Sequence, residues 1–338
     1  MMASQRDIAQ QAGVSQMAVS LALRDSPTLP AATRQRIQKL ARELDYRPDP
    51  MLSSLMRQRH AKATKVPRAK IVVLHNNSRA AGQSVSAHYA TAACKGAREF
   101  ATERGYIFES VYLNHRQLSG KRLSEILWTQ NVQGLIIAPL PMGTLLELDW
   151  FRFAVVSLDY SITSTPMHRV IDDHMAGMAR LIPRLLEKNY RRPGLVMREA
   201  NDDRTNHNRL GAFLALCART PALKPVPPLL FPKDTWDELR LAAWLRRHSP
   251  DVLVTGEPQI LDALHHQGIV PPRDLGVASF YKDPRLRRLS GITVDPIQVG
   301  RVAARVLISM VESNLRGVPA VPTITHVDAT DWDVGETL

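Results

Sequence analysis

The sequence predicts an N-terminal all-α helix-turn-helix headpiece with a hinge helix, followed by a larger α/β domain. Three short helical segments occupy the first 45 residues, with a glycine between the first two. Positive charge is concentrated in the same region. From residue 69 onward, apolar strands alternate with amphipathic helices, a pattern typical of parallel sheets that carry helices on both faces.

The charge distribution indicates an anionic partner. The 338 residues include 44 Lys+Arg and 32 Asp+Glu, a net charge of +12. Residues 1–68 hold 12 Lys/Arg and 5 Asp/Glu, a net charge of +7, and no carboxylate lies between Asp49 and Glu99. Beside a phosphate backbone, the Lys and Arg of such a stretch would replace counterions. The alternative interpretation is a solvated basic linker.

The composition favours a cytoplasmic protein. Cys94 and Cys217 are far apart and have neither metal-ligand nor redox spacing, which fits a reducing compartment. No apolar run follows a basic N-terminal start, and no apolar segment reaches bilayer length. We therefore expect a soluble, nucleoid-associated protein of two or three structural units.

Polar and glycine signals define the first helix. Ser4 can cap its start, with Asp7 three residues later. Ile8 and Ala9 then begin a short apolar face, and Gly13 suits a left-handed helix stop.

Two further helices complete a helix-turn-helix domain over residues 1–47. The second is expected over about 16–24, after a capping Ser15, and the third over about 31–44. Three residues have the key spacing: Ala9, Gly13 and Val19. A small residue lets two helices approach, a glycine makes the turn, and a branched residue fixes the second helix on the first. An ordinary three-helix structural domain is the alternative.

A short hinge helix is expected within residues 48–68, which otherwise form a basic linker. Asp49 can cap this helix with Pro50 at its first position, where the missing N–H costs nothing. Leu55 lies on its apolar face. Because so short a helix is unstable alone in water, we expect it to form only when DNA and a partner subunit support it.

The segment SQRDIAQQAGVSQMAVSLALRD…TRQRIQKLARELDYRPD resembles the headpiece of the LacI/GalR family of bacterial transcription regulators, closely over residues 4–58. The resemblance implies that the second helix enters the major groove. It also implies that two hinge helices pair in the minor groove, where Leu55 wedges between base pairs. The other expected DNA-binding residues are Ser4, Ser15, Gln16, Met17, Ser20, Leu21, Thr33, Arg57 and Arg59.

Chemistry supports these roles. Gln16 can pair with adenine through two hydrogen bonds, and Met17 and Leu21 can contact thymine methyl groups. Serine hydroxyls and helix N-termini suit phosphates. An apolar wedge costs unstacking but permits a bend that brings more protein onto the DNA. Packing of Leu55 on the α/β domain that follows is the alternative.

The headpiece departs from the family pattern at three places. Pro30 stands where a Ser/Thr cap usually opens the third helix, and Leu21 replaces a frequent arginine. In the hinge, Leu52 and Ser53 replace a small residue and an arginine. The preferred operator is therefore expected to differ from the usual one of the family.

Residues 69–338 are predicted to alternate between strands and helices. The expected strands are 70–76, 107–113, 134–140, 153–159, 193–199, 251–257 and 275–281. The expected helices are 88–104, 119–131, 175–188, 206–219, 235–248, 258–267 and 296–315. Neither a G-x-G-x-x-G motif nor a P-loop is present, so no nucleotide or other cofactor is indicated.

Three segments of this domain resemble the sensor of the same family, which has the two-lobed fold of periplasmic sugar-binding proteins. They are VIDDHMAG, NRLGAFLAL and GITVDPIQVGRVAARVLISMVESNLRGVP. By the resemblance, the domain binds an effector and dimerises. Its first lobe would comprise about 69–166 and 295–322, and its second about 167–290 and 326–338.

Candidate effector-binding residues lie at expected strand ends or match family ligand positions. They are Asn76, Asn77, Asp159, Asp172, Arg209, Trp236 and Tyr281. Such side chains can bridge sugar hydroxyls, and a tryptophan can stack on a sugar face. Capping of a turn by Asp159 and a core position for Trp236 are the alternatives.

In the family, two residue pairs that commonly line the pocket are replaced in this chain. Tyr281-Lys282 replaces Asp-Asp, and Gly256-Glu257 replaces Asn-Asp. The effector is therefore expected to be carbohydrate-related, with a phosphorylated, acidic or larger glycan as the alternative to a simple sugar.

These observations favour a homodimeric transcription regulator, most simply a repressor on a palindromic operator, with DNA affinity set by a small molecule. No catalytic or metal site is expected, because the histidines lack metal-ligand spacing and no nucleophile elbow is present. One rival is a solute-binding protein without DNA function, which the N-terminal helices argue against. The other is an α/β enzyme with an appended DNA-binding domain, which predicts turnover of its ligand.

Overall fold

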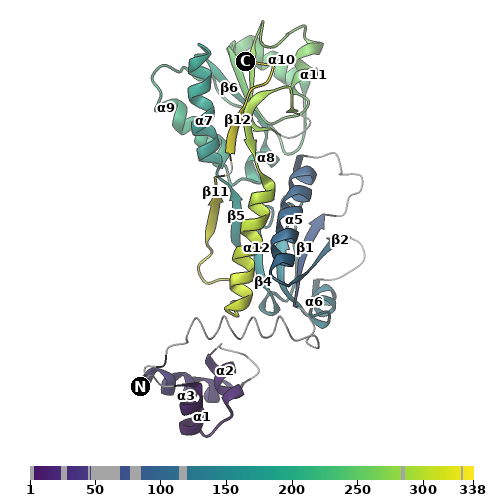
Figure 1. The fold of residues 1–338 in the computed structure, drawn as a ribbon. Helices are drawn as coiled ribbons and strands as arrows, with labels where there is room; N and C mark the ends of the chain where they lie inside the picture. Colours follow the sequence, from purple (N-terminus) through teal and green to yellow (C-terminus); the bar gives the residue numbers. More distant parts are fainter. Residues whose placement is uncertain are drawn as a thin grey trace. The chain divides into compact units, whose positions relative to one another are not determined.

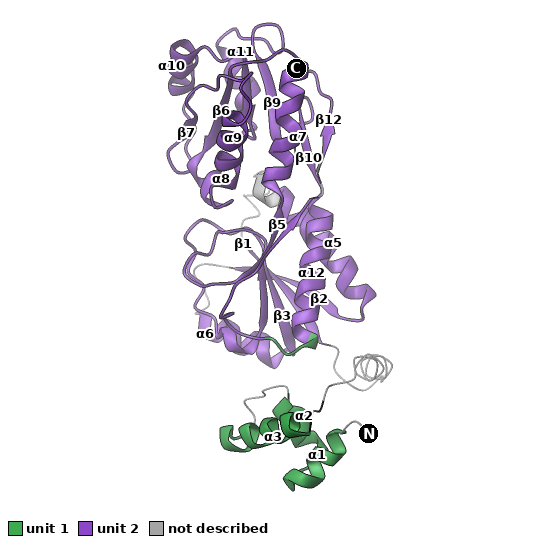
Figure 2. Cartoon of the chain, turned by 90° about the vertical axis from the view of Figure 1, so that its left-hand side faces the viewer, with its two compact units in different colours: residues 1–68, 312–315 green, residues 69–311, 316–338 purple. Residues whose placement is uncertain are grey.

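The computed structural model describes residues 4–23, 29–44, 46, 69–76, 85–113, 120–282, 286–328 and 330–338. The chain divides into two compact units, residues 1–68 with 312–315 and residues 69–311 with 316–338 (Figure 2). The expected hinge helix, with Leu55, Arg57 and Arg59, lies outside the described residues, as does Asn77.

The first unit contains three helices, α1 (Gln5–Ala12), α2 (Gln16–Leu23) and α3 (Ala31–Glu43) (Figure 1). A capping box starts α1: the Ser4 hydroxyl oxygen accepts from the Asp7 amide at 3.3 Å, and the Asp7 carboxylate accepts from the Ser4 amide at 2.7 Å. Gly13 ends α1 in the left-handed region at φ 63°. The helix-turn-helix predicted from these signals is confirmed.

A small apolar core holds the three helices together. Its buried members are Ile8, Ala9, Val19, Ala22, Ile37 and Ala41. On α2 the buried positions are Val19 and Ala22, while Leu23 is only partly buried. The Gln38 amide of α3 donates to the Ala22 carbonyl at 2.9 Å, so α3 also satisfies the C-terminal end of α2.

The second unit contains two sheets, each with six strands among the described residues (Figure 1). The first sheet has the order β11-β5-β4-β3-β1-β2, and all its pairings are parallel. Its strands are β1 (Lys70–Asn76), β2 (Ile107–Leu113), β3 (Val132–Ile137), β4 (Ala154–Ser157), β5 (His168–Asp172) and β11 (Ile324–Val327).

The second sheet has the order β12-β10-β9-β8-β6-β7 and is parallel except for the antiparallel pair of β10 and β12. Its strands are β6 (Pro193–Arg198), β7 (Leu229–Phe231), β8 (Val252–Thr255), β9 (Gly276–Lys282), β10 (Ser290–Val294) and β12 (Thr330–Asp333). Each sheet defines one lobe.

Helices join the strands and cover the sheets. They are α5 (Val85–Glu103), α6 (Gly120–Thr129), the 3-10 turn η1 (Trp150–Arg152), α7 (His174–Glu187), α8 (Glu199–Asp203), α9 (Asn208–Ala218), α10 (Glu238–His248), α11 (Ile260–His266) and α12 (Pro296–Glu312). None of the described helices is long and apolar enough to cross a membrane.

Five short strands, β5, β7, β10, β11 and β12, are additions to the expected set. Each has three to five residues, which is too short for a hydrophobic period to stand out. Two of them extend the first lobe. The expected lobe boundaries at about 166 and 322 fall just before β5 and β11, which both belong to the first sheet.

Alternation along the strands divides the core into layers. In the first sheet, Val72 and Leu74 point toward a cluster with α6, whereas Ile71 and Val73 pack with α5 and α12. Successive side chains of a strand point to opposite faces, so one apolar run supplies both layers. The second sheet is covered in the same way by α7 and α9 on one face and by α10 and α11 on the other.

The helices α5 and α12 approach each other through two glycines. A Cβ at Gly96 would lie 1.9 Å from the Ile297 carbonyl oxygen, and one at Gly300 would lie 1.8 Å from the Ala93 carbonyl oxygen. Only hydrogen fits at these two points. The glycines therefore set the separation of the two helices on this face of the first sheet.

We predict that Gly300→Ala destabilises the protein by about 1–3 kcal/mol or more, because the new methyl group forces the helices apart. The matched control is Gly211→Ala on α9, where a Cβ meets no atom within 4 Å. It should raise stability by about 0.5–1 kcal/mol, since alanine favours a helix over glycine. Urea unfolding measures both changes, and equal effects of the two substitutions would contradict the packing argument.

Candidate effector-binding site and DNA-reading helix

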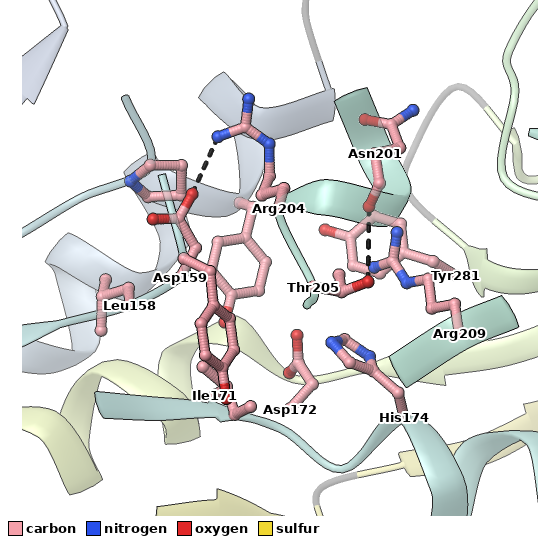
Figure 3. A pocket seen from close by; sticks show the side chains of 13 residues that line it. Leu158, Asp159, Ile171, Asp172, His174, Asn201, Arg204, Thr205, Arg209 and Tyr281 are labelled. Carbon is pink, nitrogen blue, oxygen red and sulfur yellow. Dashed lines mark hydrogen bonds and ion pairs between the residues drawn. The ribbon is translucent and has the colours of Figure 1, made fainter. Parts of the chain in front are cut away.

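A pocket lies in the second unit where strands of both sheets end (Figure 3). Its free volume is about 60 Å³, several times the roughly 10–15 Å³ that one water needs. The lining residues are Tyr89, Pro139, Leu158, Asp159, Tyr160, Ile171, Asp172, His174, Asn201, Arg204, Thr205, Arg209 and Tyr281. Carboxyl ends of parallel strands are the usual place for ligands in such sheets.

Asp159 follows β4 and joins the two lobes. One carboxylate oxygen accepts from the Ser161 amide at 3.0 Å and from the Ser161 hydroxyl at 2.6 Å. The other accepts from Arg204, which follows α8 of the second lobe, at 2.8 Å. Asp159 therefore both organises the turn after β4 and forms an ion pair with the second lobe.

Arg204 reaches further into the first lobe. The nitrogen that bonds Asp159 also donates to the Leu140 carbonyl at 2.8 Å, and the Arg204 carbonyl accepts from the Tyr160 amide at 3.1 Å. Side chain and backbone of one residue thus tie the end of α8 to the first lobe.

Asp172 ends β5 and is buried against the pocket. Burial raises the pKa of this carboxyl from 3.8 to about 6, although Arg209 and a hydrogen bond from the Tyr89 phenol favour the ionised form. The pKa of Tyr89 is raised well above 10 by burial and by the neighbouring Asp172. The charge on Asp172 is therefore poorly stabilised by the protein groups around it.

Arg209 lies in the first turn of α9, and its guanidinium stacks on two aromatic rings. The centroid distances are 5.0 Å to Phe280 and 5.5 Å to Tyr281. Arg209 makes no hydrogen bond or ion pair with any residue that the structure describes. Burial lowers its pKa despite the field of Asp172.

A strained turn positions Arg209. Asn206 and His207 both have positive φ, 52° and 60°, which is costly for residues other than glycine. The His207 ring, 2.6 Å from the buried Asp202 carboxylate, helps to hold this conformation. That hydrogen bond raises the pKa of His207.

His174 begins α7 and is a neutral group at neutral pH. Burial, followed by the fields of Arg209 and His326, lowers its pKa well below 6.5. Figure 3 shows His174, Asp172 and Arg209 around the same cavity. Among the described residues, no group of three or more His, Cys, Asp or Glu could hold a metal ion.

The structure brings together four of the expected effector residues, Asp159, Asp172, Arg209 and Tyr281. Trp236 does not line the pocket and packs on Phe231 with ring centroids 4.8 Å apart. This packing fits the alternative interpretation of Trp236, a core position, rather than stacking on a sugar. Asn76 is the last residue of β1.

Sequence reasoning did not single out most of the other lining residues. Asn201, Arg204 and Thr205 come from α8 and the turn after it, a short segment without hydrophobic periodicity. The signal that could have found them is the end of β6, because chain that follows a parallel strand lies at the ligand edge. Tyr89 comes from an amphipathic helix, where an aromatic residue reads as core.

The expected DNA-reading residues of α2 differ in their exposure. Gln16 is exposed and the Met17 side chain is 73% exposed, whereas Ser20 and Leu21 are half-buried. Ser15 caps α2 by accepting from the Ala18 amide at 3.2 Å. This helix has no charged side chain.

Thr33 and Ser4, both expected to contact phosphates, differ in burial and in hydrogen bonding. Thr33 is half-buried near the start of α3. The Ser4 hydroxyl donates to Asp7 at 2.7 Å, so its proton is already engaged within the capping box. That hydrogen bond is also the main reason for the lowered pKa of Asp7.

The fold and these sites define a class: a helix-turn-helix protein with a two-lobed, periplasmic-binding-protein-like sensor. Residues 5–49 match the family model for bacterial regulatory proteins of the lacI family. Residues 182–330 match the model for the periplasmic binding protein-like domain. The N-terminal helices thus match the lacI family of bacterial regulatory proteins, and much of the second unit matches a periplasmic binding protein-like domain.

Solved structures share this fold. The lac repressor dimer bound to operator and the anti-inducer ONPF is 17% identical with a TM-score of 0.57, covering 100% of this chain and 99% of that one. The transcriptional regulator CelR in complex with cellobiose is 17% identical with a TM-score of 0.57, covering 99% of both chains. A transcription regulator-like protein from Staphylococcus haemolyticus is 14% identical at 0.60, covering 80% of this chain and 98% of that one. No curated protein sequence matches significantly.

We predict that Asp172 makes the protein less stable as pH rises from about 4 to 6. Its folded pKa of about 6 lies above the ordinary 3.8, so the native state binds more protons in this window and stability falls as they leave. Asp172→Asn should flatten the slope of urea-unfolding free energy against pH.

The matched control is Asp274→Asn. Hydrogen bonding to Arg273 and to the Val270 amide lowers the pKa of Asp274 to about 2, so its contribution is lost only as pH falls below the ordinary value. This variant should keep the wild-type slope between pH 4 and 6. An unchanged slope in Asp172→Asn would show that the carboxyl is ionised throughout.

Proposed function

We propose that the protein is a homodimeric repressor that binds a palindromic operator. Its affinity for the operator falls or rises when a small molecule binds between the lobes. The observation that carries this proposal is the exposed, uncharged face of α2 on a lacI-family headpiece. A single headpiece reads only a half-site, so a symmetric dimer suits a palindrome.

Base reading is assigned to the outward residues of α2. Gln16 offers an amide for bidentate pairing with adenine, and Met17 and Leu21 offer apolar contacts to thymine methyls. Ser15, Ser20 and Thr33 are assigned to phosphates. The Ser4 hydroxyl donates its proton to Asp7, so Ser4 would not donate to a phosphate itself. It would instead cap α1 and so place the N-terminus of that helix beside the phosphate.

Affinity and bending are assigned to the segment after the headpiece. Arg57 and Arg59 would neutralise phosphates, and Leu55 would wedge into the minor groove at the operator centre.

Effector control rests on a pocket whose lining comes from both lobes. The ion pair between Asp159 and Arg204 spans the lobes, so a ligand beside it acts on the angle of closure. If ligand and DNA favour different closure states, each changes the affinity of the other by the same factor. Asp159, Asp172, Arg209 and Tyr281 are the effector residues of this proposal, and the effector is bound without turnover.

The proposal is tested by selecting an operator from random DNA with the full-length dimer and measuring its affinity against salt. We expect the logarithm of the association constant to fall steeply and linearly with the logarithm of salt concentration. A flat response would exclude DNA binding through phosphates. Mass spectrometry of the ligand recovered from the protein would detect turnover and so distinguish an enzyme.

We predict that Gln16→Ala weakens binding to the selected operator by roughly 10–100-fold, the value of a bidentate base contact. Binding to random DNA should change little, because phosphate contacts remain. Gln130→Ala, at an exposed position of the first lobe, is the matched control and should leave both affinities unchanged. Equal weakening on operator and random DNA would remove Gln16 from base reading.

A further inference from the structure

We propose that the effector is a polyhydroxylated anion, a small molecule whose carboxylate or phosphate group binds Arg209 and whose hydroxyls reach Asp172. This inference rests on the proposed function in taking the interlobe pocket as the effector site. It names the chemical class that the pocket selects, as opposed to a neutral sugar.

The first argument is the state of Arg209. Its guanidinium lines the cavity between two aromatic rings and has no hydrogen bond or ion pair to the described protein. The Arg209 nitrogens are not among the fully buried polar atoms that lack a hydrogen-bond partner. They are therefore accessible from the cavity that Arg209 lines. Because Arg209 is half-buried, its guanidinium keeps few water contacts and gains from an acceptor, and its planar fork matches the two oxygens of a carboxylate or phosphate.

The second argument is that the protein does not supply that acceptor. Asp159 already receives three hydrogen bonds, two from Ser161 and one from Arg204. Asp172 influences Arg209 through its field but forms no ion pair with it within the described structure. Neither carboxylate of the pocket therefore bonds the Arg209 guanidinium in the described structure.

A third argument comes from the two charges taken together. Burial raises the pKa of Asp172 and lowers that of Arg209, so neither charge fully compensates the other. A ligand that places an anion on Arg209 and donates a hydroxyl to Asp172 satisfies both groups. A neutral polyol satisfies Asp172 but provides only uncharged acceptors to Arg209, which form weaker hydrogen bonds.

Other groups around the cavity fit the same ligand. Arg204 uses a single terminal nitrogen for both of its bonds, so its second terminal nitrogen can also donate to an anion. The Asn201 side-chain nitrogen donates to the buried Glu257 at 2.9 Å, which holds the amide in place and leaves its oxygen for a hydroxyl. Neutral His174 adds a hydrogen-bonding group without competing charge.

The first experiment uses inorganic phosphate as the probe on the full-length protein, with sodium chloride at matched ionic strength as the reference. We expect phosphate to raise the melting temperature in a saturable manner. Arg209→Met should weaken phosphate binding, measured by calorimetry, by about 10–100-fold, the range for a hydrogen bond to a charged group. Arg219→Met, at an exposed position directly after the same helix, should bind phosphate as the wild type does.

The second experiment compares matched ligands: glucose, glucuronate and glucose 6-phosphate, with the corresponding galactose and mannose sets. We expect an acid or a phosphate to bind at least tenfold more tightly than its neutral parent, and the better of the two identifies the anionic group. If Arg209→Met does not fold, Arg209→Gln, which retains hydrogen-bond donors without charge, replaces it in both experiments.

The inference is overturned if phosphate acts no differently from chloride, if loss of the Arg209 charge leaves phosphate affinity unchanged, or if neutral sugars bind as tightly as their anionic counterparts. Its failure is distinct from failure of the proposed function. A protein that selects an operator but prefers neutral sugars keeps the function and loses the anion. A protein that binds anions through Arg209 but selects no operator keeps the anion inference and loses the proposed function.

Discussion

The ion pair between Asp159 and Arg204 is the interaction on which the sensor site depends. Its side chains are only 6% and 20% exposed, and it joins a strand end of one lobe to the helix end of the other. Breaking a buried pair of this kind costs about 3–5 kcal/mol, because one charge is left without a partner. The pair also engages Asp159 and one terminal nitrogen of Arg204, whereas Arg209 and Asp172 line the pocket without an ion pair in the described structure.

The two units differ in where they place charged side chains. In the headpiece, α2 carries no charged side chain. Under the proposed function, sequence discrimination would fall to an amide and apolar groups, and affinity would come from basic residues elsewhere. In the second unit, Asp172 and Arg209 interact through their electric fields, and no hydrogen bond or ion pair joins them in the described structure. Under the proposed function, a ligand that satisfies both groups would gain binding energy in one state of the lobes, and that difference is what an effector needs in order to shift an equilibrium.

The predictability of each part follows from the range of the interactions that form it. The capping box of Ser4 and Asp7, the left-handed Gly13 and the amphipathic helices are local signals, and the structure has them where the sequence predicts. The long apolar strands were equally visible. The short strands β5 and β11 were not, because their place in the first sheet depends on pairing across more than 150 residues.

The sequence by itself determined the headpiece, the alternation of strands and helices, and the candidacy of Asp159, Asp172, Arg209 and Tyr281, since each follows from local spacing or from a motif. Tertiary structure alone decided that Trp236 packs against the core, that Arg204 bridges the lobes, and that no described side chain forms a hydrogen bond or ion pair with Arg209. The physical reason is that a hydrogen bond or ion pair is set by distances of about 3–4 Å between atoms. Residues far apart in the chain reach those distances only once both sheets have formed.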